Sequence, residues 1–319
     1  MIFINLAFTI LNQVVIMFII IFIGVLCYKI KLITVGGTKE LSSIVLQIVN
    51  PAVIFSAYQR DFDKELLNGL VISLLLSALS FIVAVIVSYA FLKKSEKNEY
   101  DIERFSCIYS NCGFMGIPLV NALLGAEGVF YLTAFLTIFN LLIWTHGIIQ
   151  ISGVRSFKSI VSALKSPSVI AIFIGLISFL LRAVIPVDIS DAFTESVFMK
   201  AVGYIADMNT PLAMIVAGAT IAQVDILKAI KKSRVYIVSF LRLLVIPILI
   251  LIIFSFIEVN ENARLTVIIA MAAPTATMST LFCLKYDKNY VYSSEIFAVT
   301  TILSIVTMPL VMMLNGLIN

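Results

Sequence analysis

The chain has 319 residues, of which 61% are hydrophobic and only 13% are charged, and its formal net charge is +4. Soluble domains carry roughly 25% charged residues, so this composition excludes a soluble globular protein and predicts a polytopic membrane protein. The basic residues lie in short loops between apolar runs, which excludes a basic surface for nucleic acid.

Ten apolar segments follow one another along the chain, each close to the roughly 20 residues that a spanning helix needs. The first segment has no charged n-region and no small-residue cleavage site, so we expect a spanning helix there rather than a signal peptide. The loops are too short for a soluble domain. The predicted spans are Phe3–Tyr28, Leu41–Tyr58, Gly69–Leu92, Phe105–Leu124, Gly128–Ser152, Pro167–Val187, Ala201–Ala222, Val235–Ile257, Leu265–Leu284 and Ser293–Gly316.

Lysine and arginine are distributed unevenly over the loops. Loops that follow odd-numbered segments carry 16 of the 22 basic residues, the other loops together with the end of the sixth segment carry 5, and Arg242 lies inside the eighth segment. Positive residues collect on the cytoplasmic side, so the odd-numbered loops are predicted to be cytoplasmic and both termini external. We therefore expect a multi-pass protein of the cell membrane, inner or plasma, surrounded by lipid.

Four mid-span prolines keep a matched spacing in the two halves of the chain. Pro51 and Pro118 are 67 residues apart, and Pro211 and Pro274 are 63 residues apart. Five spans in each half give the second half the opposite orientation, so the pattern predicts an all-α fold of ten transmembrane helices in a 5+5 inverted repeat. The predicted parts are a first repeat (1–152), a short cytoplasmic linker (153–166) and a second repeat (167–319).

Two of these segments are interrupted near their middle, in the runs NCGFMGIPL (111–119) and MAAPTATMST (271–280). Proline removes a backbone donor and clashes with the preceding turn, so the helix opens. Open backbone is tolerated at membrane depth only where protein or a water-filled cavity surrounds it. We expect Pro118 and Pro274 to take the first helical position of each second half-helix. Two positive dipole ends would then point at the membrane middle and favour an anion.

Small polar residues surround both predicted interruptions. An asparagine amide can donate to a carboxylate, and glycine lets the backbone open and another helix cross closely. Helix packing is the alternative role for these residues. The substrate-binding candidates are Asn111, Gly113, Gly116, Thr275, Thr277 and Ser279, and the crossover or hinge candidates are Pro118 and Pro274.

Ionisable residues inside membrane spans are few, and each is a functional candidate by default. Asp207, Glu295 and His146 are candidates for coupling or gating, with interfacial, capping or packing roles as the alternatives. Arg242 is expected to snorkel to the cytoplasmic side. The four cysteines have neither a zinc spacing nor a disulfide framework, so no metal or cofactor is expected.

The run from Asn111 to Leu119 resembles the crossover motif of the auxin efflux carrier family, which includes bacterial permeases similar to the plant PIN-formed carriers. The resemblance implies an elevator-type carrier with the crossed broken helices of the bile-acid symporter and antiporter fold. Helices 1, 2, 6 and 7 would form the scaffold, and helices 3–5 and 8–10 the transport domain. It also implies that Asn111 touches a substrate carboxylate, such as that of malate or malonate. A homodimer formed through the scaffold helices is one possible assembly, which the sequence does not decide. Further similarity to the last two helices of the family lies in Ala272, Ala273, Pro274, Tyr286, Thr300, Ser304, Thr307 and Pro309.

The sequence therefore predicts a secondary transporter of a small organic anion, a mono- or dicarboxylate, and not an enzyme. A channel or a metabolite-sensing membrane protein on the same fold is the alternative. An intramembrane enzyme would need a nucleophile or a metal cluster, and no HExxH motif or paired catalytic carboxylates accompany His146 and Asp207. No phosphate-cradling Gly-rich loop with lysine indicates an ATP-driven pump. The direction of transport and the coupling ion, H+, Na+ or none, stay open.

Overall fold

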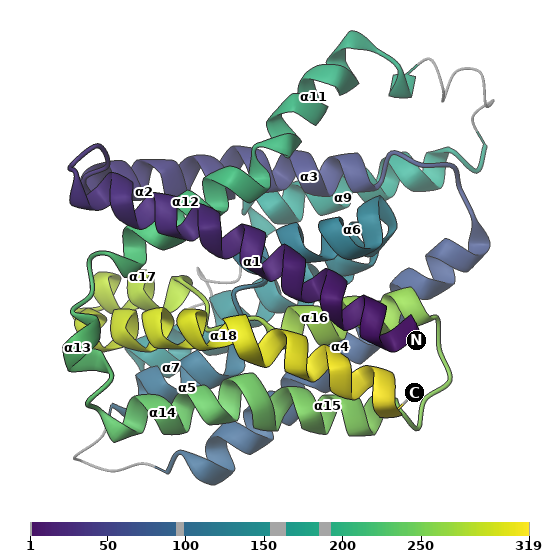
Figure 1. Ribbon diagram of the computed structural model, residues 1–319. Helices are drawn as coiled ribbons and strands as arrows, with labels where there is room; N and C mark the ends of the chain where they lie inside the picture. The colour runs from purple at the N-terminus through teal and green to yellow at the C-terminus, as the bar shows by residue number, and fades with distance from the viewer. Residues whose placement is uncertain (1, 94–98, 154–163, 185–192, 319) are drawn as a thin grey trace.

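The computed structural model describes residues 2–93, 99–153, 164–184 and 193–318. These residues form helices joined by turns and no strand, apart from one isolated antiparallel bridge between Ser110 and Thr275. Both chain ends lie at the same end of the molecule, where α1 begins and α18 ends (Figure 1). The first helices are α1 (Ile2–Lys29), α2 (Val35–Ile44), η1 (Val45–Val49), α3 (Asn50–Ala57), α4 (Lys64–Phe91), α5 (Tyr100–Ile108), η2 (Cys112–Gly116), α6 (Ile117–Leu142), η3 (Ile143–Gly147) and α7 (Ile148–Ser152). The later helices are α9 (Pro167–Leu181), α11 (Val197–Asp207), α12 (Asn209–Ile221), α13 (Ile226–Ala229), α14 (Ser233–Phe240), η4 (Leu241–Val245), α15 (Ile246–Phe254), α16 (Glu261–Ala272), α17 (Met278–Lys285) and α18 (Tyr290–Ile318).

Six helical stretches of the described chain are long and apolar enough to cross a bilayer. The protein is therefore a multi-pass membrane protein, while the count of ten spans stays a prediction. The sixth predicted span ends among residues 185–192, and most of the predicted linker also lies outside the described residues. The six stretches are Thr9–Lys29, Val35–Ala57, Lys64–Phe91, Cys112–Ser152, Ser233–Phe254 and Tyr290–Ile318.

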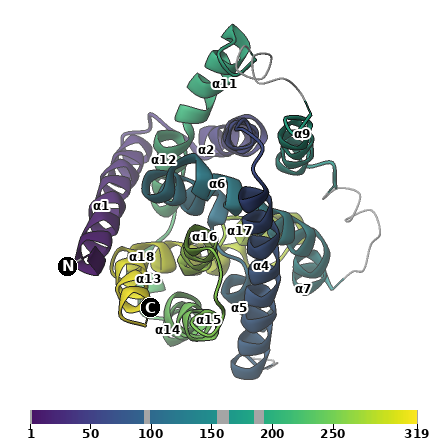
Figure 2. The same cartoon turned by 90° about the vertical axis from the view of Figure 1, so that its right-hand side faces the viewer.

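The helices form two packed groups, and in Figure 2 helices such as α9 and α15 are seen nearly end-on, whereas α1 and α4 are seen lengthwise. In one group α1 packs on α12, and α3 packs on both α9 and α11. In the other group α6 packs on α4 and α16, and α18 packs on α14 and α17. The groups meet where α12 contacts η2, where α3 contacts α6 and where α1 lies along α18.

Three prolines bend helices without opening them. Each follows a five-residue π-turn by two positions. Proline cannot donate to the carbonyl four residues earlier and its ring clashes with that carbonyl, so one wider turn absorbs the misfit. The π-turns η1, η2 and η4 precede Pro51, Pro118 and Pro247, respectively.

The backbones of α1 and α12 touch directly. A Cβ atom at Gly24 would lie 2.3 Å from the carbonyl oxygen of Ile215, and one at Gly218 would lie 2.0 Å from that of Ile21. No side chain fits at such distances, so both positions require glycine. Small residues of this kind let membrane helices approach closely and pack. The first helix and the second half of the seventh predicted span are therefore joined without a layer of side chains between them.

Candidate functional site

Two non-helical stretches cross in the core of the molecule, one between α5 and η2 and the other between α16 and α17. The backbone N–H of Asn111 donates to the carbonyl of Pro274 at 2.7 Å, and the N–H of Ala276 donates to the carbonyl of Tyr109 at 2.9 Å. Each stretch thus satisfies backbone groups of the other. This mutual pairing is what permits open backbone at membrane depth. We call this pair of stretches the crossing.

The prediction that both prolines begin the second half-helices is wrong. After the first interruption the helix resumes as a π-turn at Cys112, and Pro118 is the second residue of α6. Pro274 stays in the extended stretch, and α17 begins only at Met278. The physical reasons differ for the two prolines. The wider turn of η2 accommodates Pro118 before α6 begins. The backbone at Pro274 instead stays extended because its carbonyl accepts a hydrogen bond from the N–H of Asn111.

The side chain of Asn111 carries an unpaired donor. Asn111 is 3% exposed, and its Nδ2 has no hydrogen-bond partner in the described part of the chain. A buried amide donor left unpaired costs about 1–3 kcal/mol. Around it, Gly113 leaves room beside Asn50, since a Cβ there would lie 3.4 Å from Asn50 Nδ2, and Gly116 lies against Ala270 of α16. The first stretch therefore offers a buried donor with small residues beside it.

The predicted hydroxyl residues of the second stretch separate into two kinds. Thr275 is fully buried, donates from Oγ1 to the carbonyl of Ser106 at 3.0 Å, and its N–H donates to Thr300 Oγ1 at 3.3 Å. Ser279 Oγ accepts from Ser293 Oγ at 2.7 Å. Thr277 instead lines a cavity. Two of the three hydroxyls thus hold helices together, and one faces open space.

One cavity, the Lys39 pocket, lies between α2, η1, the end of α12 and α17 and has a volume of about 230 Å³. Lys39 is the one charged side chain among the residues that line it. Gln223 Nε2 donates to Thr38 Oγ1 at 3.3 Å and ties the end of α12 to α2 at its wall. The lining residues are Val35, Thr38, Lys39, Ser42, Ser43, Leu46, Phe114, Thr220, Gln223, Thr277, Thr280, Leu281 and Leu284.

A second cavity, the Asp207 pocket, lies between α3, the end of α11 and the start of α6 and has a volume of about 200 Å³. Asp207 is the one charged side chain among its lining residues, and the buried Oγ of Ser56 beside it has no partner among the described residues. The two pockets use opposite halves of the same bent helices, α2 against α3 and α12 against α11. They therefore lie at opposite ends of those helix pairs. The lining residues are Val53, Ser56, Ala57, Asn121, Ala126, Val129, Gly203, Ala206 and Asp207.

Comparison with known proteins identifies the family of this chain. The family described as "Membrane transport protein" matches residues 9–159 and 154–312, which together cover nearly the whole chain. The chain belongs to this membrane transport protein family, the auxin efflux carrier family. An "Uncharacterized transporter" from Methanothermobacter thermautotrophicus is similar over 291 residues at 23% identity, which covers 89% of this chain and 92% of the relative. The resemblance seen in the Asn111–Leu119 motif is confirmed.

In this membrane transport protein a pair of amides lies next to the crossing. Asn209 Nδ2 donates to Asn50 Oδ1 at 2.7 Å, both residues are less than 5% exposed, and Asn209 Oδ1 has no partner among the described residues. The two residues sit at the bends of the two halved helices, next to Pro51 and Pro211. Sequence reasoning used these prolines but missed the amides as site residues. Their places shortly before the mid-span prolines, one residue before Pro51 and two residues before Pro211, were the signal that could have found them.

His146 lies one side chain away from the crossing. Its Nδ1 is 2.9 Å from Tyr109 Oη, and its Nε2 is 3.4 Å from Tyr89 Oη. Tyr89 donates onward to Gln150 Oε1 at 2.5 Å, and Gln150 Nε2 donates to Asp101 at 2.9 Å. A hydrogen-bonded chain thus runs from Asp101 at the start of α5 to the tyrosine that enters the crossing.

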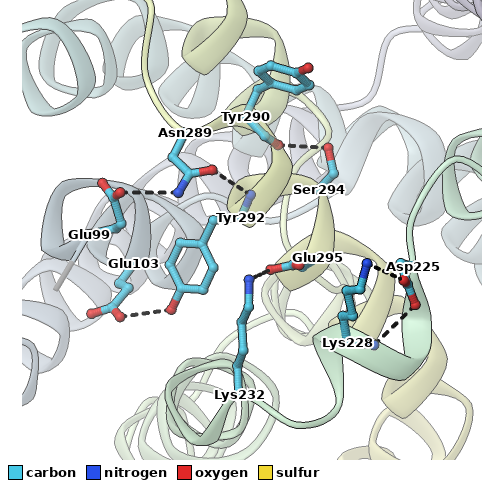
Figure 3. Close-up of polar contacts among 10 residues, drawn as sticks. All are labelled: Glu99, Glu103, Asp225, Lys228, Lys232, Asn289, Tyr290, Tyr292, Ser294 and Glu295. Atoms are coloured by element: carbon cyan, nitrogen blue, oxygen red, sulfur yellow. Dashed lines mark hydrogen bonds and ion pairs between the residues drawn. The ribbon is translucent and has the colours of Figure 1, made fainter.

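Glu295 lies away from the crossing, in the second turn of α18. Its Oε2 is 2.5 Å from Lys232 Nζ, as Figure 3 shows beside the bond from Tyr292 Oη to Glu103. Glu103 is 1% exposed and also pairs with Arg234. The buried carboxylates of Glu103 and Glu295 therefore both have basic partners.

The expectation that Arg242 snorkels is wrong. The residue is 0% exposed, and its guanidinium is turned inward to backbone carbonyls of the crossing helices. A long side chain snorkels only when its charge lacks partners at depth, and here the partners are present. The described residues hold no group of three His, Cys, Asp or Glu side chains that could bind a metal ion.

Proposed function

We propose that this protein is an elevator-type secondary carrier of a small organic anion, a mono- or dicarboxylate, in the cell membrane. The observation that carries the proposal is the buried, unpaired Nδ2 of Asn111 beside the crossing. A buried donor without a partner favours an acceptor ligand, and an ionised carboxylate accepts hydrogen bonds more strongly than neutral groups. Membership of a membrane transport family supports the same conclusion.

The two pockets support alternating access to this site. Inverted repeats generate equivalent openings on the two sides of a membrane, and carriers of this kind rock or slide one unit around a fixed site. We assign the Lys39 pocket to the cytoplasmic side because the basic loops, including the one before α2, belong there by the charge rule. The Asp207 pocket then opens outward, and both termini are external.

The helix groups support a division into a scaffold and a moving unit. The direct contact between α1 and α12 and the packing of α3 on α9 and α11 suit a scaffold of predicted helices 1, 2, 6 and 7. Helices 3–5 and 8–10 surround the crossing and would move with it. The ten spans then form two five-helix repeats, over 1–152 and 167–319.

The size and charge of the Lys39 pocket favour a small anion. Pockets for drug-sized ligands measure roughly 300–1,000 Å³, so a cavity of about 230 Å³ suits a smaller molecule. A single lysine at its wall raises the local concentration of anions without fixing them in place. A second carboxylate on the substrate would gain most from Lys39, which favours dicarboxylates over monocarboxylates.

Counterflow in proteoliposomes tests the proposal. Vesicles are loaded with unlabelled malonate, malate or pyruvate, and uptake of the labelled acid is followed, with protein-free vesicles as the control. We expect internal substrate to accelerate uptake, because only a carrier returns faster when loaded. Flux without acceleration would indicate a channel, and binding without flux would indicate a sensor; either result would overturn the proposal. Repeating the assay with choline in place of Na+, and with the pH gradient collapsed, distinguishes Na+ coupling, H+ coupling and uniport.

A further inference from the structure

Arg242 lies in η4 and is among the largest fully buried side chains of the protein. No carboxylate of the described residues forms an ion pair with it. Its guanidinium instead donates to four backbone carbonyls. Nε donates to Ala273 at 3.1 Å, Nη1 donates to Cys107 at 2.9 Å and to Ile108 at 3.3 Å, and Nη2 donates to Met271.

These carbonyls belong to the ends of the two first half-helices. Cys107 and Ile108 are the last two residues of α5, while Met271 is next to last in α16 and Ala273 follows its end. The last carbonyls of a helix have no partner within the helix. They also carry the negative end of its dipole, equivalent to roughly half an elementary charge. Two such ends converge at the crossing, so together they offer about one negative charge.

We propose that Arg242 is a tethered cation that occupies the cation site formed by the C-terminal ends of α5 and α16, so that the crossing is stable without a bound alkali ion. One guanidinium supplies one positive charge and several donors in a planar fork, which matches the charge and the number of the carbonyls. A lysine would supply the charge but could not span four carbonyls from two helices. The side chain comes from a third helix, so it also fixes that helix to the crossing.

The proposal has a consequence for transport, and that consequence alone rests on the proposed function. A carrier whose helix ends are already neutralised does not need Na+ at this site to assemble its substrate site. The carbonyls of Ile108 and Ala273 lie directly before Tyr109 and Pro274, whose own carbonyls pair the two stretches, so Arg242 acts as a positioning residue for Asn111 through the backbone of the crossing. It does not touch the substrate.

Thermal melting of the full-length purified protein tests the tethered cation without any substrate. We expect Arg242→Met to melt ~5 °C or more below the wild type, because four carbonyls lose their donors. Millimolar methylguanidinium should restore part of the loss in a saturable way and leave the wild type unchanged. Arg104→Met is the matched control, since Arg104 also donates to a helix-end carbonyl, that of Leu92, but is half-buried where water can replace it. Methylguanidinium should not affect this control.

Three results would overturn the proposal: an Arg242→Met protein as stable as the wild type, no response of that variant to methylguanidinium, or a wild type that Na+ stabilises relative to choline at equal ionic strength. If Arg242→Met does not accumulate, Arg242→Lys decides the question. We expect Arg242→Lys to fold with intermediate stability and to respond to methylguanidinium. Stability equal to the wild type would contradict the need for a fork. These outcomes are independent of counterflow, so a failed tethered cation and a failed carrier proposal are distinguishable.

Discussion

The two stretches that cross at the centre of the molecule share a backbone pairing but differ in their side chains. The first turns directly into η2 and leaves the Asn111 amide with a free donor. The second stays extended, and the hydroxyl of Thr275 is used up in holding it to α5. Symmetry of the backbone therefore does not produce symmetry of the binding groups. We expect ligand recognition on the first stretch and structural support on the second.

The largest expected effect is on Asn111. Asn111→Ala should weaken binding of the transported acid by about tenfold or more, because a hydrogen bond to a charged group contributes about 1.5–3 kcal/mol. The melting temperature should not fall, since the Nδ2 donor that is removed has no partner among the described residues. Affinity by isothermal titration and a thermal melt measure the two quantities.

Asn140→Ala is the matched control for that variant, because Asn140 is a half-buried amide that donates to Leu136 in α6 at 2.8 Å. It should leave affinity unchanged. Equal loss of affinity in both variants would show that Asn111 is not the specific contact.

The next effect concerns the amide pair at the helix bends. Asn209→Ala removes the donor to Asn50 Oδ1 and should lower the free energy of unfolding by about 1–3 kcal/mol. If the free Oδ1 of Asn209 also faces the ligand path, affinity falls as well. A double-mutant cycle with Asn50→Ala, followed by thermal melts and titration, separates the pair from the single residues. Strict additivity would show that the two amides do not act together.

A smaller effect should follow from removing the second-stretch hydroxyl. Thr275→Val keeps the shape but loses the bond to the carbonyl of Ser106, which should cost about 1 kcal/mol of unfolding free energy. Substrate affinity should stay the same. A clear loss of affinity at unchanged stability would reverse the roles that we assign to the two stretches.

The smallest effects should come from the charges at the two pockets. An exposed charge changes binding by roughly 0.2–1 kcal/mol, so Lys39→Gln should raise the KM for substrate presented on its own side by up to about fivefold. Asp207→Asn should lower the KM on the opposite side, because a repelling charge is removed. Uptake by oriented vesicles at low and high salt measures both changes. Salt should erase them, and effects that persist at high salt would indicate direct contact instead of steering.

Much of the arrangement was predictable from local chemistry. Apolar runs and short loops indicate a multi-pass membrane protein, and the prolines at 118 and 274 mark the stretches that meet. The role of each proline was not predictable, because a π-turn such as η2 can absorb one proline while another remains extended as a hydrogen-bond acceptor. The inward turn of Arg242 was also hidden, since its partners are backbone carbonyls of α5, more than a hundred residues away, and of the end of α16.

The charged residues show the same limit. Glu295 was predicted as a coupling or gating candidate, but its partner Lys232 belongs to the segment before α14 and is apparent only once α14 packs on α18. Pairing across helices depends on rotation and depth, which a single sequence with a ten-segment pattern does not determine.

The glycine contact between α1 and α12 has a mechanical meaning. Two backbones in van der Waals contact have no side chains that could change rotamer and let one helix slide past the other. We therefore expect α1 and α12 to move together as one rigid unit. Any displacement within the molecule should occur at the helix contacts next to the two cavities, where side chains separate the helices. Replacing Gly218 by a larger residue would force α1 and α12 apart.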